Sequence, residues 1–260
     1  MGARHILVEP GSVAAVRLNR PDARNAMSDQ TLRELTEAIR ALSADPKTRV
    51  VVVRGEGKDF CAGADIEWMR RAGTLPAEQG RADAHLLSEM LQAVDECSAP
   101  VIVAAQGNVF GGGLGLLAAC DIALLAADAK LCFSECRLGI LPAVISCWVL
   151  PKIGAVNARR YYLTAELFDP AQAVAMGLAH EAVEPAQLQA RVEGLVKNIL
   201  KNGPQAVRAA KALIPRLDGQ LLVKRIELAV GELVRLRSSP EGQEGLSAFL
   251  EKRPASWVAK

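Results

Sequence analysis

Aromatic residues make up only 4% of this 260-residue chain, and neither sign of charge dominates, because 31 basic residues stand against 29 acidic ones. A near-neutral chain provides no general field for nucleic acid, so nucleic acid is not an expected partner. No apolar run reaches the length of a membrane span, since charges such as Asp121 and Asp128 interrupt the longest ones. The sequence also begins without an apolar signal segment. We therefore expect a cytoplasmic protein with no membrane contact.

Metal-binding and disulfide patterns are equally scarce. The six cysteines show no CxxC spacing, which favours reduced and mostly buried thiols. Cys132 and Cys136 leave zinc binding open as an alternative, although no histidine lies near them in the sequence. The three histidines, His5, His85 and His180, have no spacing suited to a metal or a catalytic triad. No metal site is predicted.

Half of the residues are hydrophobic, and their order predicts an α/β fold. Strand-like runs occur at 5–8, 13–18, 50–54, 101–105 and 122–126, and helical patterns at 29–42 and 82–97 lie between them. This alternation implies crossover connections and a parallel sheet. After about residue 154 the strand signals fade, and helices are expected at 157–163, 170–176, 185–200, 204–213 and 220–237. Prolines at 170, 185, 204 and 240 stand where helices would start.

Small residues mark two joints at which a strand leads into a helix. Gly111, Gly112 and Gly113 open one helical pattern, and the segment FCAGADI at 60–66 leads into a helix expected to start near Asp65. Glycine lets a ligand oxygen approach bare N–H groups at the positive end of a helix. Two such joints fit an oxyanion hole. Alternatively, the glycines only permit tight packing between strand and helix.

These two segments, FCAGADI and GNVFGGGLGLLAACDIAL at 107–124, resemble the enoyl-CoA hydratase/isomerase, or crotonase, superfamily. The resemblance continues in LNRP at 18–21, Asn25-Ala26, SECRLGILP at 134–142 and FLEKR at 249–253, in order along nearly the whole chain. It implies a crotonase-like ββα spiral core at 1–195 and a helical oligomerisation region at 196–260. It also implies an acyl-CoA substrate, no separate cofactor because coenzyme A is part of that substrate, and assembly as a trimer or as a hexamer of two trimers.

The resemblance assigns roles to individual residues. It implies that the backbone N–H groups of Ala64 and Gly112 hold the thioester oxygen and that Glu135 transfers protons. Independently, the apolar and small neighbours of Glu135 predict a raised pKa for its carboxyl group. Many hydratases of the family use a further glutamate, at the place where this chain has Gly115. The matched positions for substrate and coenzyme A are Arg24, Ala26, Ala62, Ala64, Asp65, Ile66, Gly112, Phe249 and Lys252.

Gly115 and the run at 134–146 look most like bacterial hydratases of branched glutaconyl-CoA esters, among them methylglutaconyl-CoA and isohexenylglutaconyl-CoA. The prediction is therefore reversible hydration of an α,β double bond in leucine/isovalerate or acyclic terpenoid catabolism. A glutaconyl group carries a distal carboxylate, and a cation should receive it. The sequence offers Arg70, Arg71, Arg137 and Lys152 for this role without deciding between them.

Three alternatives remain at this point. A single glutamate is also the pattern of the enoyl-CoA isomerases, which move a proton between carbons without adding water. The spacing Gly113-x-Gly115-x-x-Ala118 after a strand resembles a loose dinucleotide fingerprint, which would make the protein a nicotinamide-dependent dehydrogenase. A non-catalytic, RNA-binding member of the crotonase fold is the third alternative, and the near-neutral charge argues against it.

Overall fold

A computed structural model describes residues 4–258. Its main sheet has six strands in the order β1-β2-β3-β4-β6-β8. The strands are β1 (Ile6–Glu9), β2 (Val13–Leu18), β3 (Val50–Gly55), β4 (Val101–Ala105), β6 (Ile122–Ala126) and β8 (Glu181–Val183). Only β1 and β2 pair antiparallel, and the other neighbours pair parallel, as helical crossovers require. A small parallel sheet joins β5 (Asn108–Phe110) to β7 (Lys130–Cys132).

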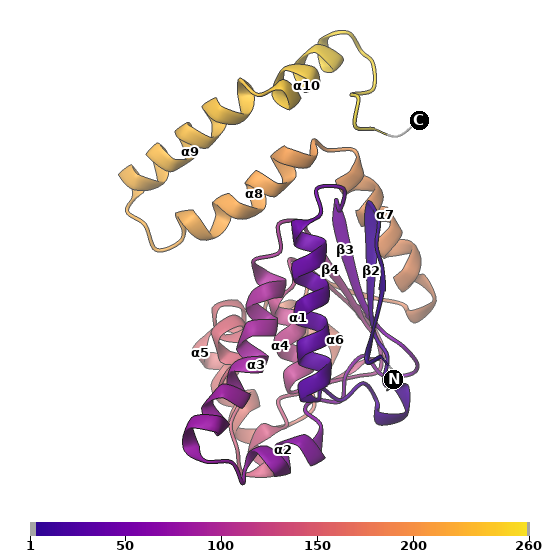
Figure 1. Ribbon diagram of the computed structural model, residues 1–260, viewed down its shortest axis with the longest axis vertical. Coiled ribbons are helices and arrows are strands. Elements are labelled where there is room, and N and C mark those ends of the chain that lie inside the picture. The colour runs from indigo at the N-terminus through magenta and orange to yellow at the C-terminus, as the bar shows by residue number, and fades with distance from the viewer. Residues whose placement is uncertain (1–3, 259–260) are drawn as a thin grey trace.

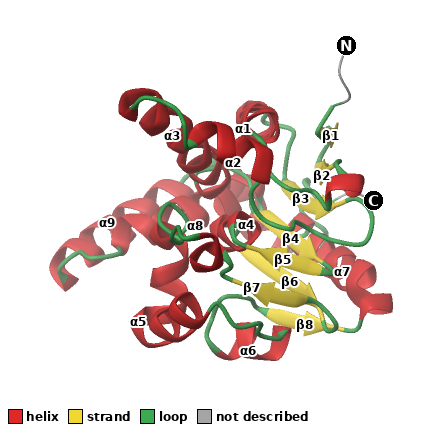
Figure 2. Ribbon diagram, turned by 90° about the horizontal axis from the view of Figure 1, so that it is seen from below, coloured by secondary structure: helices red, strands yellow, loops and turns green. Residues whose placement is uncertain are grey.

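Helices cover both faces of the main sheet, and alternate residues of β3 show this division. Val51 and Val53 belong to a large core that includes α1 (Asp29–Ala44), α3 (Ala77–Asp95) and α4 (Gly112–Ala119). Val50 and Val52 instead pack with α7 (Leu188–Leu200). Figure 2 shows α7 on one side of the strands and α4 on the other. The remaining helical segments are η1 (Pro21–Ala23), α2 (Ile66–Ala72), η2 (Glu135–Leu138), α5 (Ser146–Thr164), α6 (Pro170–Ala175), η3 (Pro185–Gln187), α8 (Pro204–Leu217), α9 (Leu222–Arg237) and α10 (Pro240–Leu250).

The last three helices extend away from the sheet (Figure 1). α9 packs against α8 and α10, and its apolar side chains stay open, with Leu222 71% exposed and Leu233 61% exposed. The predicted domain boundary at residue 195 falls inside α7, which packs on β4 and β6. By its contacts, α7 therefore belongs to the core, and the projecting segment begins with α8.

The expected strands at 13–18, 101–105 and 122–126 match β2, β4 and β6, and the four prolines each occupy the first position of a helix or 3₁₀ turn. The expectation of helices alone after residue 154 is wrong, because β8 completes the sheet beside β6. Three residues are too few to show a period, and β8 takes its extended form from pairing. Two helices also start earlier than expected. α3 begins at Ala77, and α5 begins at Ser146 and continues across a kink at Gly154.

Candidate active site

Both glycine-rich joints and η2 border one cavity of about 440 Å³. Ala62 and Ala64 line it from the joint before α2, Gly112 from the start of α4, and Glu135 from η2. Most of the remaining wall is apolar and comes from α1, α2, α3 and the segment before α5: Leu32, Ile66, Trp68, Met69, Leu87, Leu141, Val144 and Ile145. Such a wall suits an acyl chain.

The first joint leaves one backbone donor free. Met27 bridges to this segment: its N–H donates to the Gly63 carbonyl at 2.8 Å, and its own carbonyl accepts from the Asp65 N–H at 2.9 Å. These partners lie on either side of Ala64, so the Ala64 N–H turns away from Met27 and has no acceptor among residues 4–258. Gly63 has φ +103°, which only glycine adopts without strain.

The second joint exposes another donor at a helix start. Gly111 has φ +47°, and α4 begins at Gly112, so the Gly112 N–H has no acceptor within the helix. The positive end of the helix dipole adds to its pull on negative charge. A Cβ on Gly113 would lie 2.9 Å from Cys61 Cβ, so this glycine brings the two joints together. Tight packing and exposed donors are thus two consequences of the same glycine run.

Glu135 stands next to the second joint. A Cβ on Gly111 would lie 3.2 Å from Glu135 Oε1, which places the carboxyl group directly beside the start of α4. Its Oε2 is buried and finds no hydrogen-bond partner in the described part of the chain. Burial raises the pKa of Glu135 above its ordinary value, because the charged form loses its hydration. A carboxyl group with a raised pKa holds its proton more tightly, and it can serve as acceptor and then donor in a proton transfer.

Ile145 occupies the space that a glutamate side chain at Gly115 would need. A Cβ on Gly115 would lie 2.4 Å from Ile145 Cγ2, and Ile145 is 2% exposed. The absence of a side chain at Gly115 therefore makes room for Ile145. The other carboxylate on the cavity wall, that of Asp83, accepts the Trp68 Nε1–H at 3.0 Å. Glu135 is left as the uncommitted carboxyl group among the lining residues.

Several of the residues that the resemblance matches to coenzyme A positions gather at the first joint. The Arg24 carbonyl accepts the Ala62 N–H at 3.0 Å, and the Arg24 side chain is exposed. The Ala26 carbonyl accepts from Arg20 Nη1 at 2.6 Å, and Arg20 Nη2 donates to Asp65 at 2.9 Å. Asp65 also caps α2, because its carboxylate accepts two N–H groups of the first turn. Its side chain is thus committed inside the protein, whereas Arg24 remains open to solvent.

Phe249 and Lys252 do not reach this cavity within one chain. Phe249 lies in α10 and Lys252 in the turn that follows it, and α10 is at the opposite end of the molecule from α2 (Figure 1). Phe249 is 82% exposed, and Lys252 has φ +55° in the turn after the helix.

Two contributors were not assigned roles from the sequence. Arg20 ties η1 to α2, and Ser134 lines the cavity directly before Glu135. Arg137, one of the four cations offered for a distal carboxylate, also lines the cavity. Ser134 and Arg137 belong to the SECR run, so their closeness to Glu135 was a usable signal. The role of Arg20 depends on the 45-residue separation between it and Asp65, which no local pattern reveals.

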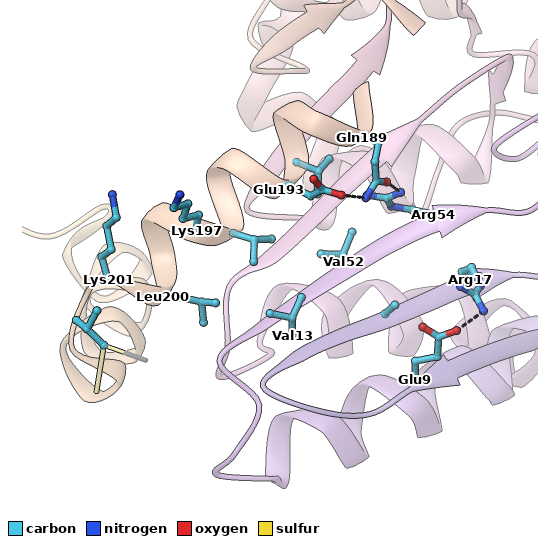
Figure 3. Close-up of a pocket in the computed structure, with 14 residues that line it drawn as sticks. Glu9, Val13, Arg17, Val52, Arg54, Gln189, Glu193, Lys197, Leu200 and Lys201 are labelled. Atoms are coloured by element: carbon cyan, nitrogen blue, oxygen red, sulfur yellow. Dashed lines mark hydrogen bonds and ion pairs between the residues drawn. The ribbon is translucent and has the colours of Figure 1, made fainter. Parts of the chain in front are cut away.

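A larger cavity of about 600 Å³ lies on the other face of the sheet, between α7 and the strands β1, β2 and β3 (Figure 3). Its arginines are engaged inside the protein: Arg17 pairs with Glu9 at 2.5 Å, and Arg54 donates to Gln189. It contains neither of the two joints, so the smaller cavity is the candidate active site.

Within residues 4–258, no group of three or more His, Cys, Asp or Glu residues is arranged to hold a metal ion. Cys132 is buried, and its Sγ–H donates to the Ala165 carbonyl at 3.1 Å, away from any zinc-like cluster. No helix of this part of the chain combines the length and apolarity that a membrane crossing needs.

The chain belongs to the enoyl-CoA hydratase/isomerase family, whose sequence pattern matches residues 9–260. It is 31% identical to crotonyl-CoA hydratase of Syntrophomonas wolfei, with 98% of each chain covered. It is 32% identical to mitochondrial methylglutaconyl-CoA hydratase of Mus musculus, covering 96% of this chain and 81% of that protein. A crystal structure of an enoyl-CoA hydratase from Shewanella pealeana superposes with a TM-score of 0.92 at 35% identity, covering 97% and 96% of the two chains.

These similarities confirm the predicted crotonase fold and make the protein an enzyme of the enoyl-CoA hydratase class. The dinucleotide interpretation of Gly113 and Gly115 is not supported. Glu135, its expected acidic partner, starts η2 after a strand of the separate small sheet, outside the main parallel sheet.

Proposed function

We propose that this enzyme adds water reversibly to the α,β double bond of a branched, glutaconyl-type acyl-CoA. One observation carries the catalytic part: Ala64 and Gly112 line the same cavity as Glu135, whose carboxyl group is partly buried. The methylglutaconyl-CoA hydratase relative supports the substrate class. A cytoplasmic location and a role in leucine/isovalerate or acyclic terpenoid catabolism follow from the same proposal.

In the forward reaction, the thioester oxygen accepts hydrogen bonds from Ala64 and Gly112. Glu135 takes a proton from water while the water oxygen bonds to the β carbon, and the electrons of the double bond shift toward the thioester oxygen. Protonated Glu135 then gives a proton to the α carbon, which restores the thioester and the carboxylate. Pre-aimed donors of this kind each contribute roughly 3–4 kcal/mol, because they act where negative charge develops.

The coenzyme A moiety binds at the joint near Arg24, Ala26 and Ala62, with Asp65 and Ile66 shaping the start of α2. Arg24 is exposed there and supplies a cation for a phosphate. Phe249 and Lys252 contribute from a neighbouring subunit, which accounts for their distance from the cavity of their own chain.

The assembly in this proposal is a trimer or a hexamer of two trimers. Its basis is the open apolar surface of the projecting helices, where the exposed side chains include Leu221, Leu222, Val223, Ile226, Val230, Leu233, Phe249 and Leu250. Several large apolar side chains left exposed on neighbouring helices are typical of a subunit interface.

An isomerase remains the second candidate, because a single uncommitted carboxyl group lines the cavity and Ile145 occupies the space beside Gly115. The test is to offer the purified enzyme a panel of enoyl-CoA esters and to follow absorbance of the conjugated double bond together with product mass. A product heavier by one water supports hydration. Unchanged mass with a relocated double bond would replace the hydratase proposal with the isomerase.

A further inference from the structure

The polar side chains that line the catalytic cavity are unevenly distributed. Four polar residues contribute to the wall, namely Asp83, Ser134, Glu135 and Arg137. Asp83 is engaged by the Trp68 indole, at the end of the cavity formed by α2 and α3. The other three belong to η2 and the residue before it. A polar group on the acyl chain therefore finds its uncommitted partners on this one segment.

Arg137 is the cation of this segment, and its guanidinium is held in place. Its Nη2 donates to the Ala165 carbonyl at 2.6 Å, and Ala165 is the residue that ends α5. A cation beside the carbonyls at a helix C-terminus is favourable, and one hydrogen bond leaves the other guanidinium N–H groups available. No carboxylate pairs with Arg137 among residues 4–258.

The other cations considered for a distal carboxylate lie outside this cavity. Arg71 pairs with Asp29 at 3.8 Å. Arg70, Arg71 and Arg137 are all exposed residues, so the contribution to the cavity wall is what separates Arg137 from the two arginines of α2. Lys152 Nζ donates to the Cys120 carbonyl at 3.2 Å and borders a different cavity, next to α8 and α9.

We propose that Arg137 binds the distal carboxylate of the acyl group and thereby selects dicarboxylic over neutral enoyl-CoA esters. This inference rests on the proposed function, because it concerns the substrate class of the same site. Glu135 acts at the α and β carbons, and Arg137 follows two residues later on the same wall, so the tail of a glutaconyl group lies along η2. At the opposite end, the carboxylate would meet apolar side chains and the like charge of Asp83. The planar guanidinium offers paired donors that match a carboxylate.

The test compares two substrates that differ only in the carboxylate, 3-methylglutaconyl-CoA and 3-methylcrotonyl-CoA. We expect Arg137→Gln to lower kcat/KM for the first by about 10- to 100-fold, the range of a charge-assisted hydrogen bond, and to leave the second nearly unchanged. Arg137→Lys keeps the positive charge but loses the paired donors of the guanidinium. Its kcat/KM for 3-methylglutaconyl-CoA should therefore lie between those of the wild type and Arg137→Gln. Arg70→Gln removes an exposed positive charge from α2 and serves as the control, with unchanged preference.

Turnover of 3-methylcrotonyl-CoA also reports whether each variant is folded, and Arg137→Lys supplies the comparison if Arg137→Gln does not fold. A wild-type enzyme that prefers the dicarboxylic ester, together with an Arg137→Gln variant that keeps this preference, would overturn the role of Arg137 alone. A wild-type enzyme without such a preference would instead remove the glutaconyl part of the proposed function. Equal loss on both substrates in Arg137→Gln and Arg137→Lys would make Arg137 a structural residue.

Discussion

The proposed reaction depends on a single carboxyl group. Glu135 has a buried Oε2 without a partner among the described residues and a pKa raised by burial. We expect Glu135→Gln to reduce kcat by about 10²- to 10⁴-fold, the usual contribution of a general acid–base. Affinity for a saturated acyl-CoA should change little, since the amide has nearly the same shape. Steady-state kinetics and calorimetric titration measure the two quantities, and a variant with near-normal turnover would remove Glu135 from the mechanism.

The same burial makes the free energy of unfolding depend on whether Glu135 is protonated. Its pKa in the folded protein is raised above the unfolded value, so its stabilising contribution is full at low pH and is lost as pH rises through the folded pKa. Glutamine carries no charge at any pH. Glu135→Gln should therefore raise the melting temperature relative to wild type at pH 8, and the gain should shrink below the ordinary glutamate pKa of 4.5. A gain that is largest at low pH would contradict a buried carboxylate.

The glycines of the second joint have different consequences for the fold. A Cβ on Gly112 meets only Met27 Sδ at 3.4 Å, which is ordinary contact, whereas a Cβ on Gly113 meets Cys61 Cβ at 2.9 Å and the Cys61 carbonyl oxygen at 3.1 Å. Gly113→Ala should therefore lower the melting temperature. Gly112→Ala should leave the melting temperature unchanged but lower the activity, because the added methyl group crowds the thioester oxygen. Circular dichroism melts with activity assays separate the two outcomes. Equal stability of both variants would show that the joints are not tightly packed.

At the scale of elements, the contact between α4 and α5 excludes a second catalytic carboxylate. Gly115→Glu would place its Cβ 2.4 Å from Ile145 Cγ2, so we expect lower stability and lower activity on branched and straight substrates alike. Overpacking of this kind typically costs about 1–3 kcal/mol. Adding Ile145→Ala should recover part of the loss in melting temperature, because the two sites share one space. Additive losses in the double variant would mean that Ile145 is not the obstacle.

Elements with a strong local pattern could be predicted from the sequence, and those defined by distant partners could not. The helical pattern at 29–42 matches α1, because the Ser28 cap, which accepts the Thr31 N–H, and the apolar spacing lie within one segment. β8 exists only through its pairing with β6. In the site, the glycine joints and Glu135 were visible as motifs. The sequence alone could not select Arg137 from the four candidate cations. The selection depends on the cavity and on the contact between η2 and the end of α5, which only the fold brings together.

At the scale of the whole molecule, the proposed site depends on two subunits. Lys252 follows α10, far from the cavity of its own chain, and the helices that carry it expose apolar faces suited to a neighbour. We expect Lys252→Ala to raise the dissociation constant for acyl-CoA more than it lowers kcat, because a lysine acts on phosphate as a point charge. Lys47→Ala, at another exposed lysine, is the matched control.

Mixed assemblies decide whether that contribution crosses the subunit boundary. Lys252→Ala chains retain Glu135, and Glu135→Gln chains retain Lys252. If the site is shared between subunits, a Lys252→Ala chain next to a Glu135→Gln chain forms one site that contains both Glu135 and Lys252. After the two variants are unfolded together and refolded as mixed oligomers, activity at substrate concentrations below KM should exceed the sum of the separately refolded variants. If Lys252 instead serves the cavity of its own chain, no mixed site contains both groups and the activities simply add. A gain in the mixture would therefore identify the oligomer as the unit that binds coenzyme A.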